Sequence, residues 1–253
     1  MAVIRSCIFA VIFYGWSSLL SPFYLPIMLL PRRVFWFMSW IWVRTCLAIA
    51  EAVVGVRYEV RGRENLPQAP FIVASKHQSA WDTLIYNKLF EDCAYVLKRE
   101  LFWFPFFGWF LWKIGMVGID RSGGAQALKG LVRQVREQLA DGRSIIIFPQ
   151  GTRTPPGAER KYLPGVSALY MQSNTAVVPI ALNSGMFWPR RKFVKHPGTI
   201  VLEILPAIEP GLDRRSFERE LRARIEPATR RLEAEAAERY GLDYEPAEPA
   251  QAG

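Results

Sequence analysis

The stretch FIVASKHQSAWD, residues 71–82, joins a short apolar run to a polar turn. An apolar run of this length, ending in polar residues, is typical of a buried strand over residues 71–74. His77 and Asp82 follow it, five residues apart. In a regular helix this spacing separates two side chains by about 140°, so they would not meet. They can meet if His77 lies on the turn and Asp82 in the first turn of the next helix, with Ser79 as its N-cap.

Short apolar runs alternate with helical patterns over much of the remaining chain. Strands that alternate with helices of this length indicate an α/β domain with a mixed, mostly parallel sheet flanked by helices. The predicted strands cover residues 57–61, 71–74, 94–97, 116–119, 144–148, 176–182 and 199–204, and the predicted helices cover residues 80–90, 123–141 and 165–172.

The N-terminal part of the chain is far more apolar than the rest. No charged residue occurs from Ser6 to Pro31, which at about 1.5 Å per residue could cross a hydrocarbon core of about 30 Å. Pro22 and Pro26 are expected to kink or end a first helix near Ser21. A signal peptide is the competing interpretation, but no small-residue cleavage site leads into a polar chain.

A second apolar stretch, residues 34–43, follows Arg32 and Arg33 and is dense in Phe and Trp. Aromatic rings of this kind suit the headgroup level of a membrane. We therefore expect residues 1–56 to form a hydrophobic helical hairpin in or on a membrane, with the two arginines at its turn and on the cytoplasmic side. The alternative is a hydrophobic helix pair packed into a soluble core.

Composition narrows the classes of partner. The 253 residues carry a net charge of +9 and are 51% hydrophobic. This apolar content excludes intrinsic disorder, and the positive charge predicts an anionic partner: nucleic acid, a membrane surface or a phosphorylated substrate. Three scattered cysteines and two histidines argue against a disulfide framework or a metal centre, and favour a reducing compartment. No nucleic-acid-binding motif is present, so nucleic acid is not an expected partner.

Two segments outside the predicted strands and helices have a marked composition. Residues 101–112, LFWFPFFGWFLW, carry no charge, and Pro105 and Gly108 would weaken a plain core helix. A lipid-facing or acyl-chain-lining segment is therefore favoured. Residues 213–239 form a charged helix pattern, expected to be solvated and split by Pro227. The chain is thus divided into a hairpin (1–56), an α/β domain (57–212) and a charged helix with a frayed tail from residue 245 (213–253).

Two more polar motifs follow predicted strands. In FPQGTRT, residues 148–154, a glycine turn comes at the carboxyl end of a strand, where α/β sheets bind ligands, and arginine can grip phosphate oxygens. The alternative is an ordinary turn with a solvated arginine. The run GMVGIDR, residues 115–121, ends in Asp120 and Arg121, for which the alternative is a surface ion pair.

The order of these motifs resembles that of the glycerolipid acyltransferase family: H-x4-D, a strand ending in Ile-Asp-Arg, Phe-Pro-x-Gly-Thr-Arg and Val-Pro-Ile. Within this family, the chain is most similar to the bacterial 1-acylglycerol-3-phosphate acyltransferases, over about residues 71–182. The resemblance implies that His77 is the general base that deprotonates the acceptor hydroxyl, and that Asp82 orients it.

The resemblance also implies which residues bind substrate. Lysophosphatidate is the implied acceptor, acyl-CoA or acyl carrier protein the implied donor, and the cytoplasmic face of the inner membrane the implied location. No metal or other cofactor is implied. The phosphate would be bound by Lys98, Arg121, Gly151, Thr152 and Arg153, and the acyl-chain path would be flanked by Phe102, Phe104, Phe106 and Trp109.

Two positions depart from the family pattern. Gln150 replaces the usual glutamate before Gly-Thr-Arg, and Gly118 replaces the usual aromatic residue before Ile-Asp-Arg, which opens space there. Either change is compatible with another acceptor, such as a lyso-aminolipid or another lysophospholipid.

Two further classes of protein would share parts of this pattern. A serine hydrolase or thioesterase would use Ser75 or Ser79 as nucleophile beside His77, although no G-x-S-x-G occurs in the chain. A non-catalytic membrane-binding protein would need only the hairpin and the positive charge, but it would leave the ordered motifs without a purpose.

Overall fold

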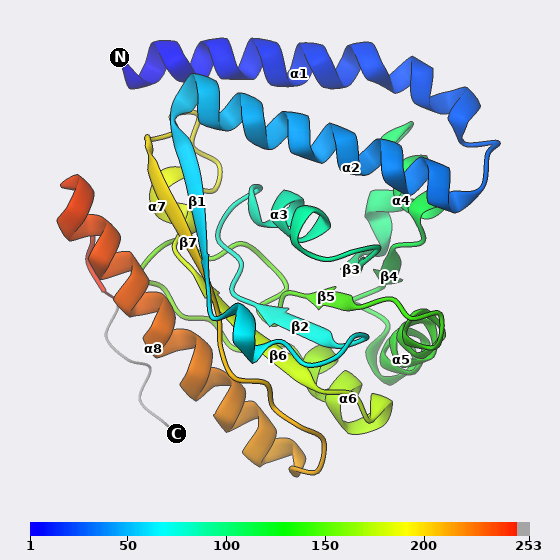
Figure 1. The fold of residues 1–253 in the computed structure, drawn as a ribbon. Helices are drawn as coiled ribbons and strands as arrows, with labels where there is room; N and C mark the ends of the chain where they lie inside the picture. Colours follow the sequence, from blue (N-terminus) through cyan, green and yellow to red (C-terminus); the bar gives the residue numbers. More distant parts are fainter. Residues whose placement is uncertain (247–253) are drawn as a thin grey trace.

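The computed structural model describes residues 1–246 and contains a seven-stranded sheet in the order β1-β7-β6-β2-β5-β3-β4 (Figure 1). Neighbouring strands are parallel except β6 and β7, which are antiparallel. The predicted mixed, mostly parallel sheet is confirmed. The strands are β1 (Val56–Arg61), β2 (Ile72–Ser75), β3 (Ala94–Lys98), β4 (Val117–Ile119), β5 (Ile145–Ile147), β6 (Val177–Leu182) and β7 (Gly198–Ile204).

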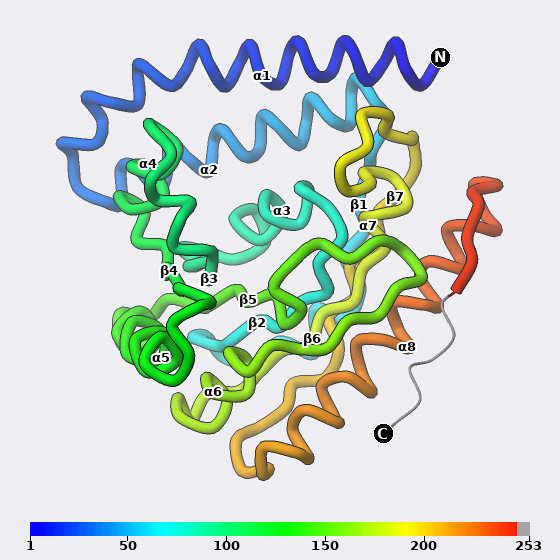
Figure 2. Tube along the Cα trace, turned by 180° about the vertical axis from the view of Figure 1, so that it is seen from behind, coloured from blue at the N-terminus to red at the C-terminus, as the bar shows by residue number. Residues whose placement is uncertain are grey.

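Helices cover both faces of the sheet, because successive strand residues point to opposite sides (Figures 1 and 2). Val73 of β2 packs in a core with α2 and α3, whereas its neighbours Ile72 and Ala74 pack in a core with α5, α6 and α8. The helices are α1 (Ala2–Ile27), α2 (Arg32–Ile49), α3 (Asp82–Leu89), α4 (Phe107–Ile114), α5 (Gly124–Ala140), α6 (Pro164–Ser173), α7 (Ser184–Phe187) and α8 (Arg214–Tyr240).

The first two helices form the predicted hairpin, and they lie side by side along one side of the α/β domain (Figure 1). Of the two outcomes expected at the prolines, an end of the helix near Ser21 is wrong, since α1 continues through Pro22 and Pro26 to Ile27. A proline removes one backbone hydrogen bond, and packing can hold the next turn in place. Here Tyr24, between the two prolines, packs on a phenylalanine of α2 and donates its hydroxyl to the Met38 carbonyl at 2.7 Å.

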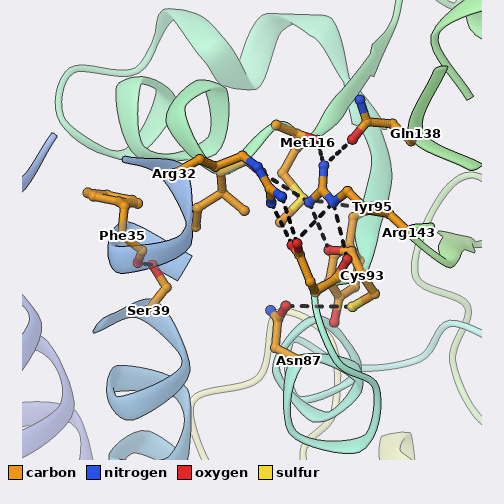
Figure 3. A network of polar contacts seen from close by, with 12 residues as sticks. Arg32, Phe35, Ser39, Asn87, Cys93, Tyr95, Met116, Gln138 and Arg143 are labelled. Carbon is orange, nitrogen blue, oxygen red and sulfur yellow. Dashed lines mark hydrogen bonds and ion pairs between the residues drawn. The ribbon is translucent and has the colours of Figure 1, made fainter. Parts of the chain in front are cut away.

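Both ends of α2 are attached to the α/β domain. Arg32, its first residue, donates two hydrogen bonds to the Asp92 carboxylate, at 2.6 and 2.7 Å (Figure 3). Arg143, which precedes β5, donates to the same carboxylate at 3.2 Å. At its other end, α2 runs through a π-helical turn (η1, Ala50–Val54) into β1. The hairpin is thus part of the fold.

The C-terminal helix differs from the prediction of a split, solvated helix. It is unbroken through Pro227 and packs against β6, because apolar side chains at helical spacing hold both of its halves on the sheet. Glu226 and Glu233 are buried on the same helix. Of the tail expected to fray from residue 245, residues 247–253 lie outside the described part of the chain. The buried apolar residues of α8 are Phe217, Leu221, Ile225, Leu232 and Ala236.

Candidate active site

The candidate catalytic and binding residues gather at one edge of the sheet. β2 leads into His77, β5 leads into Phe148, β3 ends at Lys98, and β4 leads into Arg121. These strands are parallel neighbours, so their carboxyl ends meet at the same edge. A cavity of about 860 Å³ opens there. At this edge its lining includes His77, Lys98, Asp120, Arg121, Gly151, Thr152 and Arg153.

His77 and Asp82 are in contact: the distance from Nδ1 to Oδ2 is 2.8 Å. The buried Asp82 carboxylate also accepts hydrogen bonds from the Gln78 and Ser79 backbone amides, at 2.7 and 2.8 Å, and from the Ser184 hydroxyl, at 2.5 Å. With three other donors directed at it, the carboxylate is the acceptor for His77 as well. The imidazole proton therefore lies on Nδ1, and the lone pair of Nε2 is free to accept a proton.

The turn that holds this pair differs in one detail from the prediction. Asp82 is the first residue of α3, as expected, and His77 lies on the preceding turn. Ser79 is not the N-cap: its hydroxyl accepts a hydrogen bond from the Trp81 amide at 3.1 Å. Asp82 itself accepts from the amides of the turn, so the acidic side chain organises the loop. Ser184, about 100 residues later in the chain, was not predicted.

The loop after β5 holds His77 from a second direction. The Phe148 ring stacks on the imidazole, with centroids 3.9 Å apart and planes inclined by 17°. The backbone amide of Thr154 donates to the His77 carbonyl at 2.7 Å. The FPQGTRT segment thus fixes both the ring plane and the backbone of His77.

The same loop brings the predicted phosphate ligands together. Gly151 has a φ of +65°, and a Cβ atom built on it would lie 3.3 Å from Cζ of Arg121. The guanidinium group of Arg121 therefore lies against the Gly151 backbone, although 30 residues separate them. Desolvation lowers the pKa of Arg121 and nearby Glu100 opposes this shift, but an arginine remains charged.

These cations are available to an anionic ligand. Within residues 1–246, Lys98, Arg121 and Arg153 have no carboxylate within ion-pair distance. Asp120 hydrogen-bonds to Ser122 instead, which lowers the pKa of its carboxyl group. In the described part of the chain, no group of three or more His, Cys, Asp or Glu side chains is arranged to hold a metal ion.

The other half of the cavity is apolar. Of the four residues assigned to an acyl-chain path, Phe106 lines the cavity, whereas Phe104 and Trp109 are exposed on the surface and are not in its lining. The sequence predicted that the aromatic segment contributes to the apolar lining, but it did not predict that the hairpin also contributes. The main apolar lining residues are Leu20, Tyr24, Trp42, Phe107, Phe110 and Ile114.

Phe102, the fourth of those residues, occupies the space expected to be open at Gly118. A Cβ atom on Gly118 would lie 2.7 Å from Cε2 of the Phe102 ring. The missing side chain before Ile-Asp-Arg is thus matched by an aromatic ring from another segment.

At the other departure, Gln150 is buried and its Nε2 donates to Glu226 at 3.3 Å. Glu226 lies on α8, more than 70 residues further along the chain. The sequence offered one sign of this contact: Glu226 and Glu233 directly follow apolar residues of the buried stripe, Ile225 and Leu232.

The serines considered as nucleophiles have other partners. Oγ of Ser75 lies 2.5 Å from the Tyr86 hydroxyl, whose pKa is raised by burial. Ser79 bonds to the Trp81 amide. Among the hydrogen bonds of residues 1–246, the His77 ring bonds to Asp82 and to neither serine. The nucleophile-to-base contact that a serine hydrolase requires is therefore not formed here.

Comparison with known proteins defines the class. Residues 57–183 match the family model described as Acyltransferase, and the chain belongs to this family. It is similar to the 1-acyl-sn-glycerol-3-phosphate acyltransferase of Pseudomonas aeruginosa, with 43% identity over 77% of this chain and 75% of the relative. It is 28% identical to the 1-acyl-sn-glycerol-3-phosphate acyltransferase alpha of Mus musculus, over 79% of this chain and 71% of the relative.

The fold also has a counterpart among solved structures. The crystal structure of the 1-acyl-sn-glycerophosphate (LPA) acyltransferase PlsC from Thermotoga maritima matches with a TM-score of 0.73 at 22% identity. The match covers 94% of this chain and 98% of that one. The family predicted from the order of the motifs is confirmed.

Proposed function

We propose that this protein transfers an acyl chain from an acyl thioester to the sn-2 hydroxyl of lysophosphatidate, giving phosphatidate. One observation carries this proposal. A single cavity of about 860 Å³ has in its lining the His77 imidazole, many apolar side chains, and the cations Arg121 and Arg153, which have no ion-pair partner among residues 1–246. The names of the relatives support lysophosphatidate as the acceptor.

The geometry of His77 suits general base catalysis. Nε2 takes the proton of the acceptor hydroxyl as its oxygen attacks the thioester carbonyl. The tetrahedral intermediate collapses, the carbon–sulfur bond breaks, and the thiolate receives the proton from the imidazolium. Asp82 keeps the proton on Nδ1 and stabilises the imidazolium while it exists. A base of this kind contributes roughly 10²–10⁴-fold to the rate.

The cations supply alignment. Arg121 and Arg153 would bind the phosphate of the acceptor through charge-assisted hydrogen bonds, with Lys98 beside them. Because a short glycerol unit joins the phosphate to the sn-2 hydroxyl, binding of the phosphate would place the hydroxyl near His77.

A second group of arginines supports an anionic acyl carrier. Arg190 donates to the Arg153 carbonyl at 2.8 Å, and its pKa is lowered by desolvation and by repulsion from Arg191, Arg153 and Arg160. This cationic cluster lies next to the cavity, since Arg153 belongs to both. We propose that it receives the phosphates of acyl-CoA or the acidic surface of an acyl carrier protein.

The hairpin supports residence on a membrane. Both its helices are long and apolar enough to cross one, yet only 11% of the most apolar stretch of α1 is buried, and 28% of that of Arg32–Val54. Because α2 is tied to the domain at both ends, we propose that the hairpin lies within one leaflet. Trp103 and Trp112, exposed by 74% and 71%, would then reach the headgroups. The proposed site is the cytoplasmic face of the inner membrane.

The test is an acyl-transfer assay on purified protein in lipid. Lysophosphatidate and a panel of other lysolipids are offered with acyl-CoA and acyl carrier protein donors, to wild type and to His77→Ala. Transfer to lysophosphatidate that disappears in the variant is the expected result. Transfer only to another lysolipid would keep the mechanism and change the acceptor. No transfer with any pair would contradict the proposal.

A further inference from the structure

The two residues that flank His77 in the sequence both contact the C-terminal helix. Nζ of Lys76 lies 2.6 Å from Oε2 of Glu226, and their side chains are only 1% and 3% exposed. On the other flank, Nε2 of Gln78 donates to Oε1 of Glu233. His77 itself lines the cavity, so the catalytic loop has one side facing substrate and another side held by α8.

The spacing of the two glutamates fits this arrangement. They are seven residues apart, which is close to two turns of an α-helix, so both carboxylates lie on one face of α8. The unbroken course of the helix through Pro227 matters here, because a break between the two residues would destroy their common face.

Each glutamate also reaches a second loop. Oε1 of Glu226 accepts from Nε2 of Gln150 at 3.3 Å and from the Tyr162 hydroxyl at 2.8 Å. Oε2 of Glu233 accepts from the Gly157 amide at 3.0 Å. Gln150 immediately precedes Gly151, in the loop that carries the proposed phosphate ligands. The two carboxylates thus bridge the loop of the base and the loop of the phosphate site.

This bridging has a consequence for rate because the two loops act on the same substrate. The base must meet the hydroxyl while the cations hold the phosphate, and a misplacement of about 1 Å can reduce a rate by about 10²-fold. A buried ion pair such as that of Lys76 and Glu226 favours the one loop geometry in which its charges are paired, because burial separates them from solvent.

We propose that Glu226 and Glu233 are positioning residues for acyl transfer, which hold His77 in a fixed position relative to the phosphate-binding loop. Glu226 acts through Lys76 and Gln150. Glu233 acts through Gln78 and Gly157. The inference rests on the proposed function. It places part of the catalytic apparatus on α8, outside residues 57–183, the segment that matches the family model.

The experiment moves the buried carboxylate from position 226 to position 150, because the side chains at these two positions contact each other. Glu226→Gln removes the charge at constant shape, and the double variant Gln150→Glu/Glu226→Gln restores one carboxylate within the same buried cluster, at the side chain that contacts position 226. Glu233→Gln tests the second contact, and Glu238→Gln, at an exposed position on the same helix, is the matched control. Thermal unfolding, kcat, KM for lysophosphatidate and the pH dependence of kcat/KM are measured for each protein.

We expect Glu226→Gln to lower kcat/KM by roughly 10²-fold per folded molecule, and the double variant to recover most of this loss. The acidic limb of the pH profile, which reports the base, should move in Glu226→Gln and return in the double variant. Glu233→Gln should show a smaller loss in kcat, and Glu238→Gln should match wild type.

Several results would overturn the inference. One is a Glu226→Gln protein with wild-type kcat and pH profile, whether or not its melting temperature falls, because the glutamate would then be structural only. Another is a folded double variant as impaired as the single one. If Glu226→Gln does not fold, two other results would contradict the inference. One is a folded Glu233→Gln protein with unchanged kinetics, and the other is a double variant that folds but is wholly inactive. A wild type inactive on lysophosphatidate would instead refute the proposed function.

Discussion

The two longest helices, α1 and α8, relate composition to burial in opposite ways. From Ser6 onward α1 carries no charge, yet most of its surface is exposed. By contrast, α8 is rich in arginine and glutamate, yet it buries eight residues, two of them glutamates. In water-soluble proteins, charged side chains are rarely buried unless they are paired, and large apolar surfaces are rarely exposed. The difference fits the membrane location proposed for α1, whereas the buried glutamates of α8 contact polar loops of the protein itself.

The largest expected effect separates chemistry from membrane residence. His77→Ala should lower kcat for lysophosphatidate by roughly 10²–10⁴-fold, because the base is lost while substrate alignment remains. Vesicle binding should be unchanged, since the hairpin is untouched. His196→Ala is the matched control, because the ring of this second histidine does not line the cavity. A His77→Ala enzyme with normal turnover would refute the mechanism.

On the α8 side, the next effect is on stability. Glu226→Ala leaves the Lys76 ammonium buried without its partner, so the free energy of unfolding should fall by about 3–5 kcal/mol in urea denaturation of the detergent-solubilised protein. Replacing both charges, as in Lys76→Met/Glu226→Leu, should cost much less. Glu238→Ala serves as control. A loss no greater than the control's would show that α8 is held by its apolar stripe alone.

At the mouth of the cavity, the expected effect is on acceptor affinity. Arg153→Ala should raise KM for lysophosphatidate by roughly 10–100-fold, the range for losing a charge-assisted hydrogen bond worth about 1.5–3 kcal/mol. KM for an uncharged lysolipid should change little. Arg133→Ala, at an exposed position on α5, is the control for net charge. Equal effects of the two substitutions would remove Arg153 from the phosphate site.

On the α1 side, a still smaller effect is expected on vesicle binding. Phe23 is 63% exposed, so Phe23→Ala should change the free energy of unfolding by no more than about 0.5 kcal/mol. It should weaken sedimentation with lipid vesicles, because the ring no longer transfers into hydrocarbon. Met171→Ala, an exposed apolar residue of α6, should leave vesicle binding unchanged. Equal binding by Phe23→Ala and wild type would argue that this face does not contact lipid.

The smallest effect is a pH dependence that originates in α8. Burial raises the pKa of Glu233 above its ordinary value of 4.5. The folded protein therefore retains a proton that the unfolded chain releases, so stability falls as the pH rises from about 4.5 towards the folded pKa. Glu233→Gln should lack this decline in urea denaturation curves recorded across that interval. An identical pH dependence in the variant would show that Glu233 titrates normally.

The sequence predicted the sheet well because buried parallel strands appear as continuous apolar runs. Residues 144–148 were predicted as a strand, for example, and β5 is Ile145–Ile147. The helix α4 was not predicted: Pro105 and Gly108 argued against a helix, but α4 begins after the proline, at Phe107. The contact between His77 and Asp82 was predicted correctly from their spacing, since only one turn of the chain separates them.

The residues that support His77 are harder to predict from the chain. Ser184 bonds to Asp82 and Glu226 bonds to Lys76, and both lie far from His77 in the sequence, so only the folded arrangement of the strands and α8 brings them close. The apolar residues that precede Glu226 and Glu233 indicate a buried position on α8, but they do not identify the partner of either carboxylate. The apolar residues Phe217, Leu221 and Ile225 recur at every fourth position and could have indicated a buried face, but the surrounding charges obscured it.

The place of β1 at the edge of the sheet bears on how the protein is made. β1 follows the hairpin directly, and its neighbour in the sheet is β7, which begins about 140 residues later. At translation rates of about 5–20 residues per second, the ribosome needs roughly 7–30 s to supply that partner. In the proposed membrane-bound protein, the hairpin thus has time to bind the lipid surface while the rest of the chain is still being synthesised, before β1 can pair with β7.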